Sequence, residues 1–171
     1  MLYDAVIMAG GENNSELQKI APFDNEALIL IGQYPMIYYV YQALRAVPIV
    51  NHIVVSGPVE SLRSILPKDD KLLFCEGGIN AVQSFAHAVD VLSGRGLSPM
   101  VIAVPTDVPF ITPEAIVDFL ERCQAEDADV YYPITSRAVN ERKFPGVRRT
   151  YVKLKEGVFT GGNLFLLRSQ V

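Results

Sequence analysis

YDAVIMAGG, residues 3–11, is the stretch of sequence that decides the fold. A short, mostly apolar run leads into two consecutive glycines, which is the pattern of a buried parallel strand that ends in a loop. Apolar runs of similar length recur along the chain, and each of them also ends in a glycine, proline or polar turn. These further expected strands are residues 52–56, 71–75 and 100–104.

Segments in which apolar residues recur at helical spacing follow these strands. The last of them has clear start signals, because Thr112 is suited to cap a helix, Pro113 to its first position and Glu114 to its first turn. Strands that alternate with helices require right-handed crossovers, which produce an open, mostly parallel sheet with helices on both faces. The expected helices are residues 36–46, 59–66, 79–92 and 112–124.

The remaining segments have a different character. Residues 12–25 are polar and predict a long irregular loop, and loops of this length are usually functional or mobile. Residues 129–134, 150–154 and 163–167 predict strands with no strong helix between them, so we expect a mixed sheet to close the second half of the domain. The fold class is therefore α/β, with a three-layer, Rossmann-like mixed sheet that is mostly parallel.

Composition limits the classes of function. The 171 residues fit one domain, and the net charge of −4 gives no support for a nucleic-acid-binding surface. No apolar run reaches the ~18 residues of a membrane span. Cys75 and Cys123 lack a CxxC spacing, so neither structural zinc nor a disulfide framework is expected, and a reducing cytosol is the default compartment. No motif indicates an oligomeric state.

The chain ends directly after an apolar strand, without a capping helix or a polar tail. We therefore expect residues 1–171 to be a single domain that is a fragment of a longer protein, with a natural short form as the alternative.

Candidate ligand-binding features fall at the ends of three expected strands. In an open α/β sheet, ligands bind outside the carboxyl ends of the strands. Gly10 and Gly11 follow the first strand, Gly77 and Gly78 follow the third, and Asp107 follows the fourth. This convergence predicts one site at that edge of the sheet.

Gly10 and Gly11 would let the backbone approach a phosphate or a base closely and would offer unhindered amides. A plain turn is the alternative. The dinucleotide fingerprint GxGxxG fails because Glu12 and Ser15 occupy its second and third glycine positions, and the GxxxxGK[ST] phosphate loop is absent.

Asp107 lies between Pro105 and Pro109, which stiffen its loop. A carboxylate at a strand end suits Mg²⁺ that is held together with substrate phosphates. The alternative is a capping aspartate, but Thr112 already caps the next helix. The sequence therefore favours Asp107 as a metal ligand.

The other candidates are polar groups near glycines. Gly77 and Gly78 precede a helix whose first amides favour anions, and Ser84 could contact a ribose or a base; a plain loop is the alternative. The Gly161–Gly162–Asn163 segment could bring backbone close to a bound sugar. His87 lies within a helical run and is expected to be a packed or surface residue.

Together these features resemble the nucleotidyltransferase family that includes molybdenum cofactor guanylyltransferase, methylerythritol cytidylyltransferase and sugar-nucleotide pyrophosphorylases. The matching pieces occur in family order over almost the whole chain. They are VIMAGG at residues 6–11, ALILIGQYPMI at residues 27–37, Gly77–Gly78 with Ser84, PTDVPF at residues 105–110, and Gly161–Gly162–Asn163.

The resemblance implies a GT-A type fold and a reaction in which the phosphate of an acceptor attacks the α-phosphorus of a nucleoside triphosphate, with release of pyrophosphate. Such chemistry depends chiefly on positioning and on neutralising charge. The implied partners are the nucleoside triphosphate and a phosphorylated small molecule. The implied roles are nucleotide binding for Ala9, Gly10, Gly11, Gly78 and Ser84, Mg²⁺ binding for Asp107, and acceptor binding for Gly162 and Asn163.

The sequence departs from the family pattern at charged positions. Family members carry an arginine in the glycine-rich loop and a lysine before the Ala-Leu of the second piece, but here the loop has no arginine and Glu26 takes the lysine position. Ala81 also stands where an arginine is typical. Lys19 is the candidate catalytic cation that could swing in from the loop.

Glu26 favours an alternative function, a nucleotide-binding or regulatory domain with impaired catalysis, because a carboxylate repels a triphosphate. A glycosyltransferase of related fold would need an Asp-x-Asp motif, which is absent beside Asp107. A Rossmann dehydrogenase ranks last because the glycine fingerprint is missing.

Overall fold

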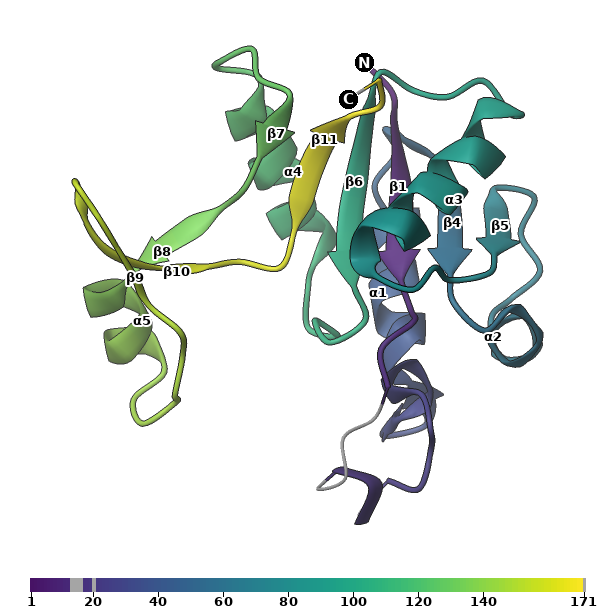
Figure 1. Cartoon of the computed structure of the whole chain (residues 1–171), viewed down its shortest axis with the longest axis horizontal. Helices are drawn as coiled ribbons and strands as arrows, with labels where there is room; N and C mark the ends of the chain where they lie inside the picture. The colour runs from purple at the N-terminus through teal and green to yellow at the C-terminus, as the bar shows by residue number, and fades with distance from the viewer. Residues whose placement is uncertain (13–16, 20, 171) are drawn as a thin grey trace.

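A mixed sheet forms the centre of the computed structural model, which describes residues 1–12, 17–19 and 21–170. Within these residues the sheet has six strands, in the order β5, β4, β1, β6, β11, β7 (Figure 1). β1, β4, β5 and β6 run parallel, whereas β11 is antiparallel to both β6 and β7. The strands are β1 (Tyr3–Met8), β4 (Val50–Ser56), β5 (Leu72–Cys75), β6 (Met100–Pro105), β7 (Val130–Tyr131) and β11 (Phe165–Arg168).

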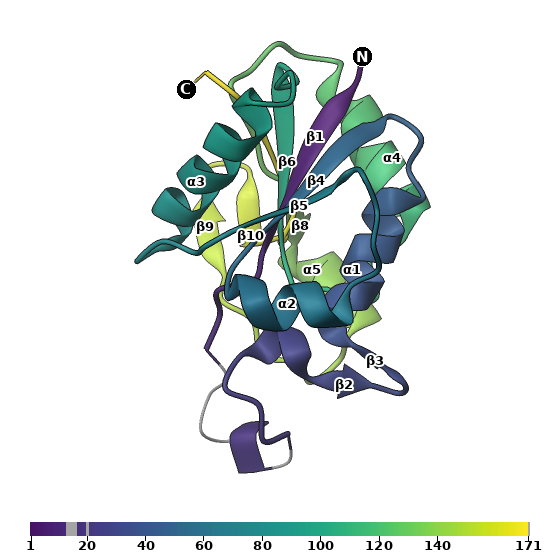
Figure 2. The same ribbon diagram turned by 90° about the vertical axis from the view of Figure 1, so that its right-hand side faces the viewer.

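Helices cover both faces of this sheet, as the sequence predicted (Figure 2). Adjacent side chains of a strand point to opposite faces. Val6 of β1 accordingly packs in a cluster with Ala88 and Leu92 of α3, while Ile7 packs in a second cluster with Leu44 of α1. α2 and α4 contribute to the second cluster. The helices are α1 (Met36–Arg45), α2 (Val59–Ile65), α3 (Ala81–Ser93) and α4 (Pro113–Cys123).

The predicted start of α4 is confirmed. The Thr112 side chain accepts a hydrogen bond of 3.2 Å from the backbone amide of Ala115, and Pro113 is the first helical residue. The α3 helix begins two residues later than expected, because Asn80 is its N-cap and accepts 2.9 Å from the amide of Gln83. An asparagine at the cap satisfies an amide that the helix itself leaves unpaired.

The second half of the chain differs from the expected single mixed sheet. β7 and β11 join the central sheet, but β8 (Ile134–Ser136), β10 (Gly157–Gly161) and β9 (Val152–Leu154) form a separate antiparallel sheet in that order. This sheet and α5 (Arg137–Lys143) project to one side of the central sheet (Figure 1). We call residues 134–161 the arm.

The α5 helix was not predicted, because its sequence RAVNERK has no apolar stripe to signal a helix. Local polar interactions hold it instead. Ser136 caps its start by accepting from the amide of Val139, and Arg137 pairs with Glu141 one turn later at 2.7 Å.

A long connection, residues 9–35, separates β1 from α1, and we call it the excursion. It contains the short turns η1 (Leu17–Lys19) and η2 (Glu26–Leu28), followed by the hairpin of β2 (Leu30–Ile31) and β3 (Tyr34–Pro35), whose turn contains Gly32 at a φ of 65°. Residues 13–16, part of the predicted loop that includes Ser15, lie outside the described residues. Among the described helices, none combines the length and the apolar character that a membrane span requires.

Candidate active site

The carboxyl ends of β1, β4, β5 and β6 meet at one edge of the sheet, as predicted. Met8 pairs in register with Pro105 on one side and with Ser56 on the other, and Ser56 pairs with Cys75. The residues that follow these strands are therefore neighbours. They are Ala9–Gly11, which we call the glycine loop, together with Gly57, Gly77–Gly78 and Thr106–Asp107.

The glycine loop is packed tightly at one end and open at the other. A Cβ atom at Gly57 would lie 2.6 Å from the carbonyl oxygen of Ala9, so the chain can pass there only as glycine. The amide of Ala9 donates a hydrogen bond of 2.8 Å to the carbonyl of Ser56. At Gly10, by contrast, a Cβ atom would meet nothing within 4 Å. The backbone at Gly10 therefore borders open space that a ligand could occupy.

Asn25 holds the glycine loop in place, a role that the sequence analysis missed. Its side-chain amide donates 2.7 Å to the carbonyl of Ala9, and its side-chain oxygen accepts 2.8 Å from the amide of Ala27 at the start of η2. An asparagine just before a helical turn is a recognisable cap signal. No local sequence pattern predicts its bond to Ala9, because that acceptor lies 16 positions earlier in the chain.

Glu26 lies directly against the glycine loop. Its carboxylate contacts Gly11, where a Cβ atom would overlap it, and its amide donates 3.2 Å to the carbonyl of Gly11. Burial raises the pKa of the Glu26 carboxyl, and the negative charge of Asp107 raises it further. The hydroxyl of Thr106 has a smaller, opposite effect on this pKa. Glu26 is therefore part of the site and places a negative group beside the loop.

Asp107 and Thr106 occupy the end of β6. The Asp107 side chain is exposed, and within the described part of the chain it makes no hydrogen bond or ion pair. Thr106 is fully buried, and its hydroxyl forms no hydrogen bond of normal geometry although it lies near Glu26. An unpaired carboxylate at this position fits a hard cation such as Mg²⁺, which typically takes one or two carboxylates plus substrate phosphates.

The side chains of the protein do not by themselves supply a complete set of ligands for a metal ion. Among residues 1–12, 17–19 and 21–170, no three His, Cys, Asp or Glu side chains gather closely enough to hold an ion. The remaining ligands of a cation at Asp107 would have to be water and phosphate oxygens, which is the usual arrangement for Mg²⁺ in phosphoryl-transfer sites.

Ser84 is buried and organises the second glycine turn. Its hydroxyl accepts 2.9 Å from the amide of Gly78, and a Cβ atom at Gly78 would lie 2.6 Å from the Cβ of Gln83. Ser84 and Gly78 thus lie at the predicted edge of the sheet, where they fix the turn that leads into α3. His87 is half-buried, and its ring nitrogen contacts the carbonyl of Glu76 at 3.2 Å, so it is packed as expected.

Gly162 and Asn163 border the same end of the sheet. They line a mostly apolar groove of about 560 Å³, together with Met8 and Pro105 at the ends of β1 and β6 and with Val82 from the first turn of α3. The structure therefore brings the predicted acceptor residues to the strand ends that carry the glycine loop and Asp107.

Lys19 is not brought to the strand ends. It is exposed in η1, and the segment of residues 17–19 lies at the far end of the excursion, beyond the carboxyl end of β1 (Figure 1). Its catalytic role stays a prediction that would require the excursion to fold back over the site.

The arm adds basic residues that the sequence analysis missed. Lys143 and Arg149 line a groove of about 480 Å³, the arm groove, which Gly161 and Gly162 also line. The guanidinium of Arg149 donates 3.0 Å to the carbonyl of Gly161. Because the α5 helix, which supplies Lys143, was not predicted, no sequence pattern grouped these residues.

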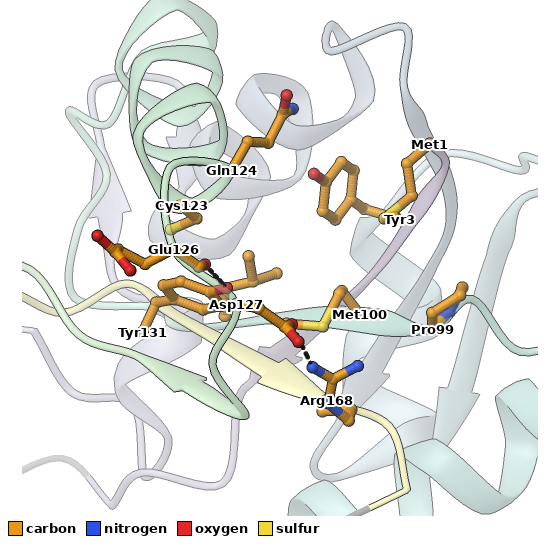
Figure 3. Close-up of a pocket in the computed structure, with 11 residues that line it drawn as sticks. Met1, Tyr3, Pro99, Met100, Cys123, Gln124, Glu126, Asp127, Tyr131 and Arg168 are labelled. Atoms are coloured by element: carbon orange, nitrogen blue, oxygen red, sulfur yellow. Dashed lines mark hydrogen bonds and ion pairs between the residues drawn. The ribbon is translucent and has the colours of Figure 1, made fainter.

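A further cavity, of about 350 Å³, lies at the opposite end of the sheet, where Tyr3 begins β1 and Met100 begins β6 (Figure 3). Arg168 borders it, but this guanidinium is already paired with Asp127 at 2.7 Å and with Asp129 at 2.6 Å. Ligands of open α/β sheets bind at the carboxyl ends of the strands. This cavity is therefore not the candidate site.

Comparisons with known proteins agree with this geometry. A family model described as MobA-like NTP transferase domain matches residues 5–156. A search of curated proteins finds no match. Among solved structures, a hypothetical transferase from Thermus thermophilus superimposes with a TM-score of 0.77 at 29% sequence identity, and the alignment covers 99% of this chain and 67% of that one.

Two more distant structures share the fold. The 2-C-methyl-D-erythritol 4-phosphate cytidylyltransferase of Francisella tularensis has a TM-score of 0.70 at 14% identity, covering 99% of this chain and 73% of its own. A CMP:2-keto-3-deoxy-manno-octonic acid synthetase, solved in complex with CTP, has a TM-score of 0.69 at 16% identity, covering 100% of this chain and 76% of its own.

Proposed function

The chain belongs to the MobA-like NTP transferase domain family, and we propose that it transfers a nucleoside monophosphate from a nucleoside triphosphate to a phosphorylated small molecule, with release of pyrophosphate. One observation carries this proposal. The register of Met8 against Pro105 brings the glycine loop and Asp107 to neighbouring strand ends, where the open backbone at Gly10 and the unpaired carboxylate of Asp107 could contact one ligand.

In the proposed reaction, a phosphate oxygen of the acceptor attacks the α-phosphorus. The bond from the α-phosphorus to the oxygen that bridges to the β-phosphorus breaks, and that oxygen leaves as part of pyrophosphate. The glycine loop would hold the phosphates through the amides of Gly10 and Gly11. Asp107 would hold Mg²⁺, which when bound neutralises charge on the phosphates.

The nucleoside would lie toward α3. The turn at Gly78, fixed by the hydroxyl of Ser84, offers backbone groups close to the glycine loop, because Gly77 lies next to Gly57 across the ends of β4 and β5. In this proposal Ser84 acts by shaping the turn that contacts the nucleoside.

A phosphorylated acceptor is supported by the arm groove. Lys143 and Arg149 provide positive charge within one groove that Gly161 and Gly162 also line. Gly162 also lines the apolar groove with Asn163, so an acceptor that spans both grooves could place its anionic group on the arm and its reacting end near Asn163.

A nucleotide-binding domain with impaired catalysis is the second candidate, and Glu26 favours it. The position that the family fills with lysine holds a carboxylate, which contacts Gly11 and repels a triphosphate. This candidate predicts nucleotide binding without pyrophosphate release.

A thermal-shift series with ATP, GTP, CTP and UTP, each with and without Mg²⁺, tests binding. A ligand that binds only the folded state raises the melting temperature by mass action. We expect one triphosphate to give a shift that requires Mg²⁺ and that Asp107→Asn abolishes. Asp70→Asn is the matched control, because Asp70 is an exposed carboxylate just before β5, at the opposite end of the sheet.

Unchanged Mg²⁺-dependent binding in Asp107→Asn would refute the assigned role of this carboxylate, and the absence of any shift with all four triphosphates would refute nucleotide binding. Pyrophosphate release with a panel of phosphorylated small molecules then separates the two candidate functions. For the active enzyme, the double variant Lys143→Ala/Arg149→Ala should raise the KM for the acceptor and leave nucleotide affinity unchanged.

A further inference from the structure

The charge of the chain is divided unevenly between the arm and the rest of the molecule. Residues 134–161 include seven lysines and arginines but only two acidic residues, both glutamate, so the arm carries a net charge of +5. Because the whole chain carries −4, the residues outside the arm carry −9. The arm also projects to one side of the central sheet (Figure 1). The arm is therefore the part of the chain that attracts anionic molecules, whereas the rest of the chain, taken as a whole, repels them.

The arm groove contains part of this positive charge and no opposing charge. Its lining includes Lys143 and Arg149 but no aspartate or glutamate. Both side chains are exposed, and within the described residues neither takes part in an ion pair. The guanidinium of Arg149 donates to the neutral carbonyl of Gly161, which leaves other N–H groups of its fork for a ligand. Two cations in one groove without carboxylates are suited to bind a phosphate or a carboxylate.

The arm groove is separated from the glycine loop by more than the size of one phosphate. In the central sheet β6 lies between β1 and β11, so the end of β1 and the start of β11 are two strand spacings apart, about 10 Å. The arm precedes β11 in the chain and projects farther away from β1 (Figure 1). The reacting phosphate of the acceptor has to lie beside the α-phosphorus, which the proposed function places at the glycine loop. The positive charge of the arm groove is therefore left for a second anionic group.

The mostly apolar groove connects these two places. Gly162 lines both grooves, and Met8, at the end of β1, lines the apolar one. The rings of Tyr132 and Phe165 also line it, and they are stacked with their centroids 4.5 Å apart. A Cβ atom at Gly161 would overlap the hydroxyl of Tyr132, so the strand and the ring are in close contact where the two grooves meet. The middle of a ligand that spans both grooves is accordingly uncharged and mostly apolar.

We propose that the acceptor is a small molecule with two anionic groups at opposite ends of an apolar body. The reacting phosphate is one end, the body lies along Tyr132 and Phe165, and the second anion, a phosphate or a carboxylate, is held by Lys143 and Arg149. The inference names the class of acceptor and rests on the proposed function for the identity of the reacting end. Binding of the second anion to the arm needs no nucleotide.

Octanediol bisphosphate and octyl phosphate are a matched pair of probes, because they share the apolar chain and differ in the second anion. Each is titrated into the full chain by calorimetry, in buffer that contains Mg²⁺ but no nucleotide. We expect the bisphosphate to bind about tenfold more tightly than the monophosphate, because one probe reaches both the arm and the glycine loop. In Lys143→Ala/Arg149→Ala the two probes should bind equally.

The control variant is Lys68→Ala/Arg95→Ala. It removes the same two types of exposed side chain beside β5, the strand at the opposite edge of the central sheet, and should keep the tenfold preference. Arg149→Lys keeps the charge but not the fork that donates to Gly161, and should keep most of the preference. A melting curve of each variant shows that it is folded. The proposal is overturned if the wild type does not prefer the bisphosphate, if the preference survives in Lys143→Ala/Arg149→Ala, or if the control loses it equally.

Pyrophosphate release separates this inference from the proposed function. If phosphorylated molecules without a second anion serve as acceptors as well as doubly anionic molecules of the same size, the proposed function stands and the present inference fails. If the bisphosphate binds through the arm but no triphosphate binds, the site for two anions stands and the proposed function fails.

Discussion

The side-chain amide of Asn25 donates a hydrogen bond of 2.7 Å to the backbone carbonyl of Ala9, which ties the excursion after β1 to the glycine loop. The side-chain oxygen of Asn25 simultaneously caps η2, the turn that begins with Glu26. One side chain thus sets the position of the loop and of the carboxylate that contacts it.

Asn25→Asp should weaken nucleotide binding and leave the cap intact. Aspartate keeps the oxygen that accepts from Ala27 but cannot donate to Ala9, so the glycine loop loses its anchor. A charge-free hydrogen bond contributes about 1 kcal/mol, and we expect an affinity loss of about fivefold to tenfold by calorimetry. Asn51→Asp makes the same chemical change near the amino end of β4 and serves as the control. Equal affinity in Asn25→Asp and wild type would contradict the anchoring role.

Gly57→Ala and Gly10→Ala should affect different properties. At Gly57 the added Cβ would lie 2.6 Å from the carbonyl oxygen of Ala9, so backbone must move and the free energy of unfolding should fall by about 1–3 kcal/mol. At Gly10 the Cβ meets nothing within 4 Å, so stability should change by less than about 0.5 kcal/mol. Nucleotide affinity should nevertheless fall in Gly10→Ala, because the methyl group enters the space next to the loop. Chemical denaturation and nucleotide titration measure the two effects, and a Gly57→Ala protein as stable as the wild type would argue against the tight approach.

Glu26→Lys should raise triphosphate affinity in the absence of metal. The change replaces a carboxylate beside Gly11 by an ammonium, which attracts the phosphates instead of repelling them. We expect at least a tenfold gain by calorimetry in metal-free buffer, and pyrophosphate release if Glu26 alone impairs catalysis. Glu121→Lys introduces the same change of charge at an exposed position of α4, away from the loop. An equal gain in both variants would mean that overall charge, and not the contact with the loop, limits binding.

Tyr41 should make stability depend on pH in the alkaline range. Burial, followed by the hydrogen bond of 2.8 Å to Asp69 and the charge of that carboxylate, raises the pKa of Tyr41 from 10.0 to about 12, against the opposing effect of Arg45. The folded protein therefore keeps a proton that the unfolded chain releases near pH 10. The stabilisation is complete below pH 10 and is lost as the pH rises toward 12.

Tyr41→Phe should remove this part of the pH dependence, and at neutral pH it should lower the free energy of unfolding by about 1 kcal/mol through the lost hydrogen bond. Denaturation curves below and above pH 10 measure both quantities. Tyr34→Phe is the control, because the Tyr34 ring is exposed and stacked on Tyr38. An unchanged alkaline slope in Tyr41→Phe would show that other groups cause it.

Local signals in the sequence located the parallel strands and the four α-helices of the first 124 residues, but not the turns η1 and η2 or the hairpin of β2 and β3. Apolar periodicity and the Thr112 cap located α4 to within a residue, because a buried helix must carry an apolar stripe and satisfy its first amides. The same reasoning failed for α5, which has no apolar stripe and instead has a serine cap, a surface ion pair and a buried asparagine that bonds to Tyr151. Sequence reasoning also placed residues 150–154 in the mixed sheet of the second half, whereas β9 pairs with β10 in the arm. The reason is that an exposed strand carries no sequence pattern that specifies its partner strand.

The sequence by itself determined that apolar strands end in glycines and in Asp107, because residue identity and spacing are local properties of the chain. The expectation of a lysine at the position of Glu26 came from the resemblance to a family. Only the tertiary structure decided which of these groups meet. The parallel register of β1 and β6 brings Asp107 to the glycine loop, and the bond from Asn25 to Ala9 turns Glu26 against Gly11. Lys19, in contrast, lies with η1 at the far end of the excursion (Figure 1). Contacts between residues 16 to about 100 positions apart arise from packing and strand pairing, which no local pattern encodes.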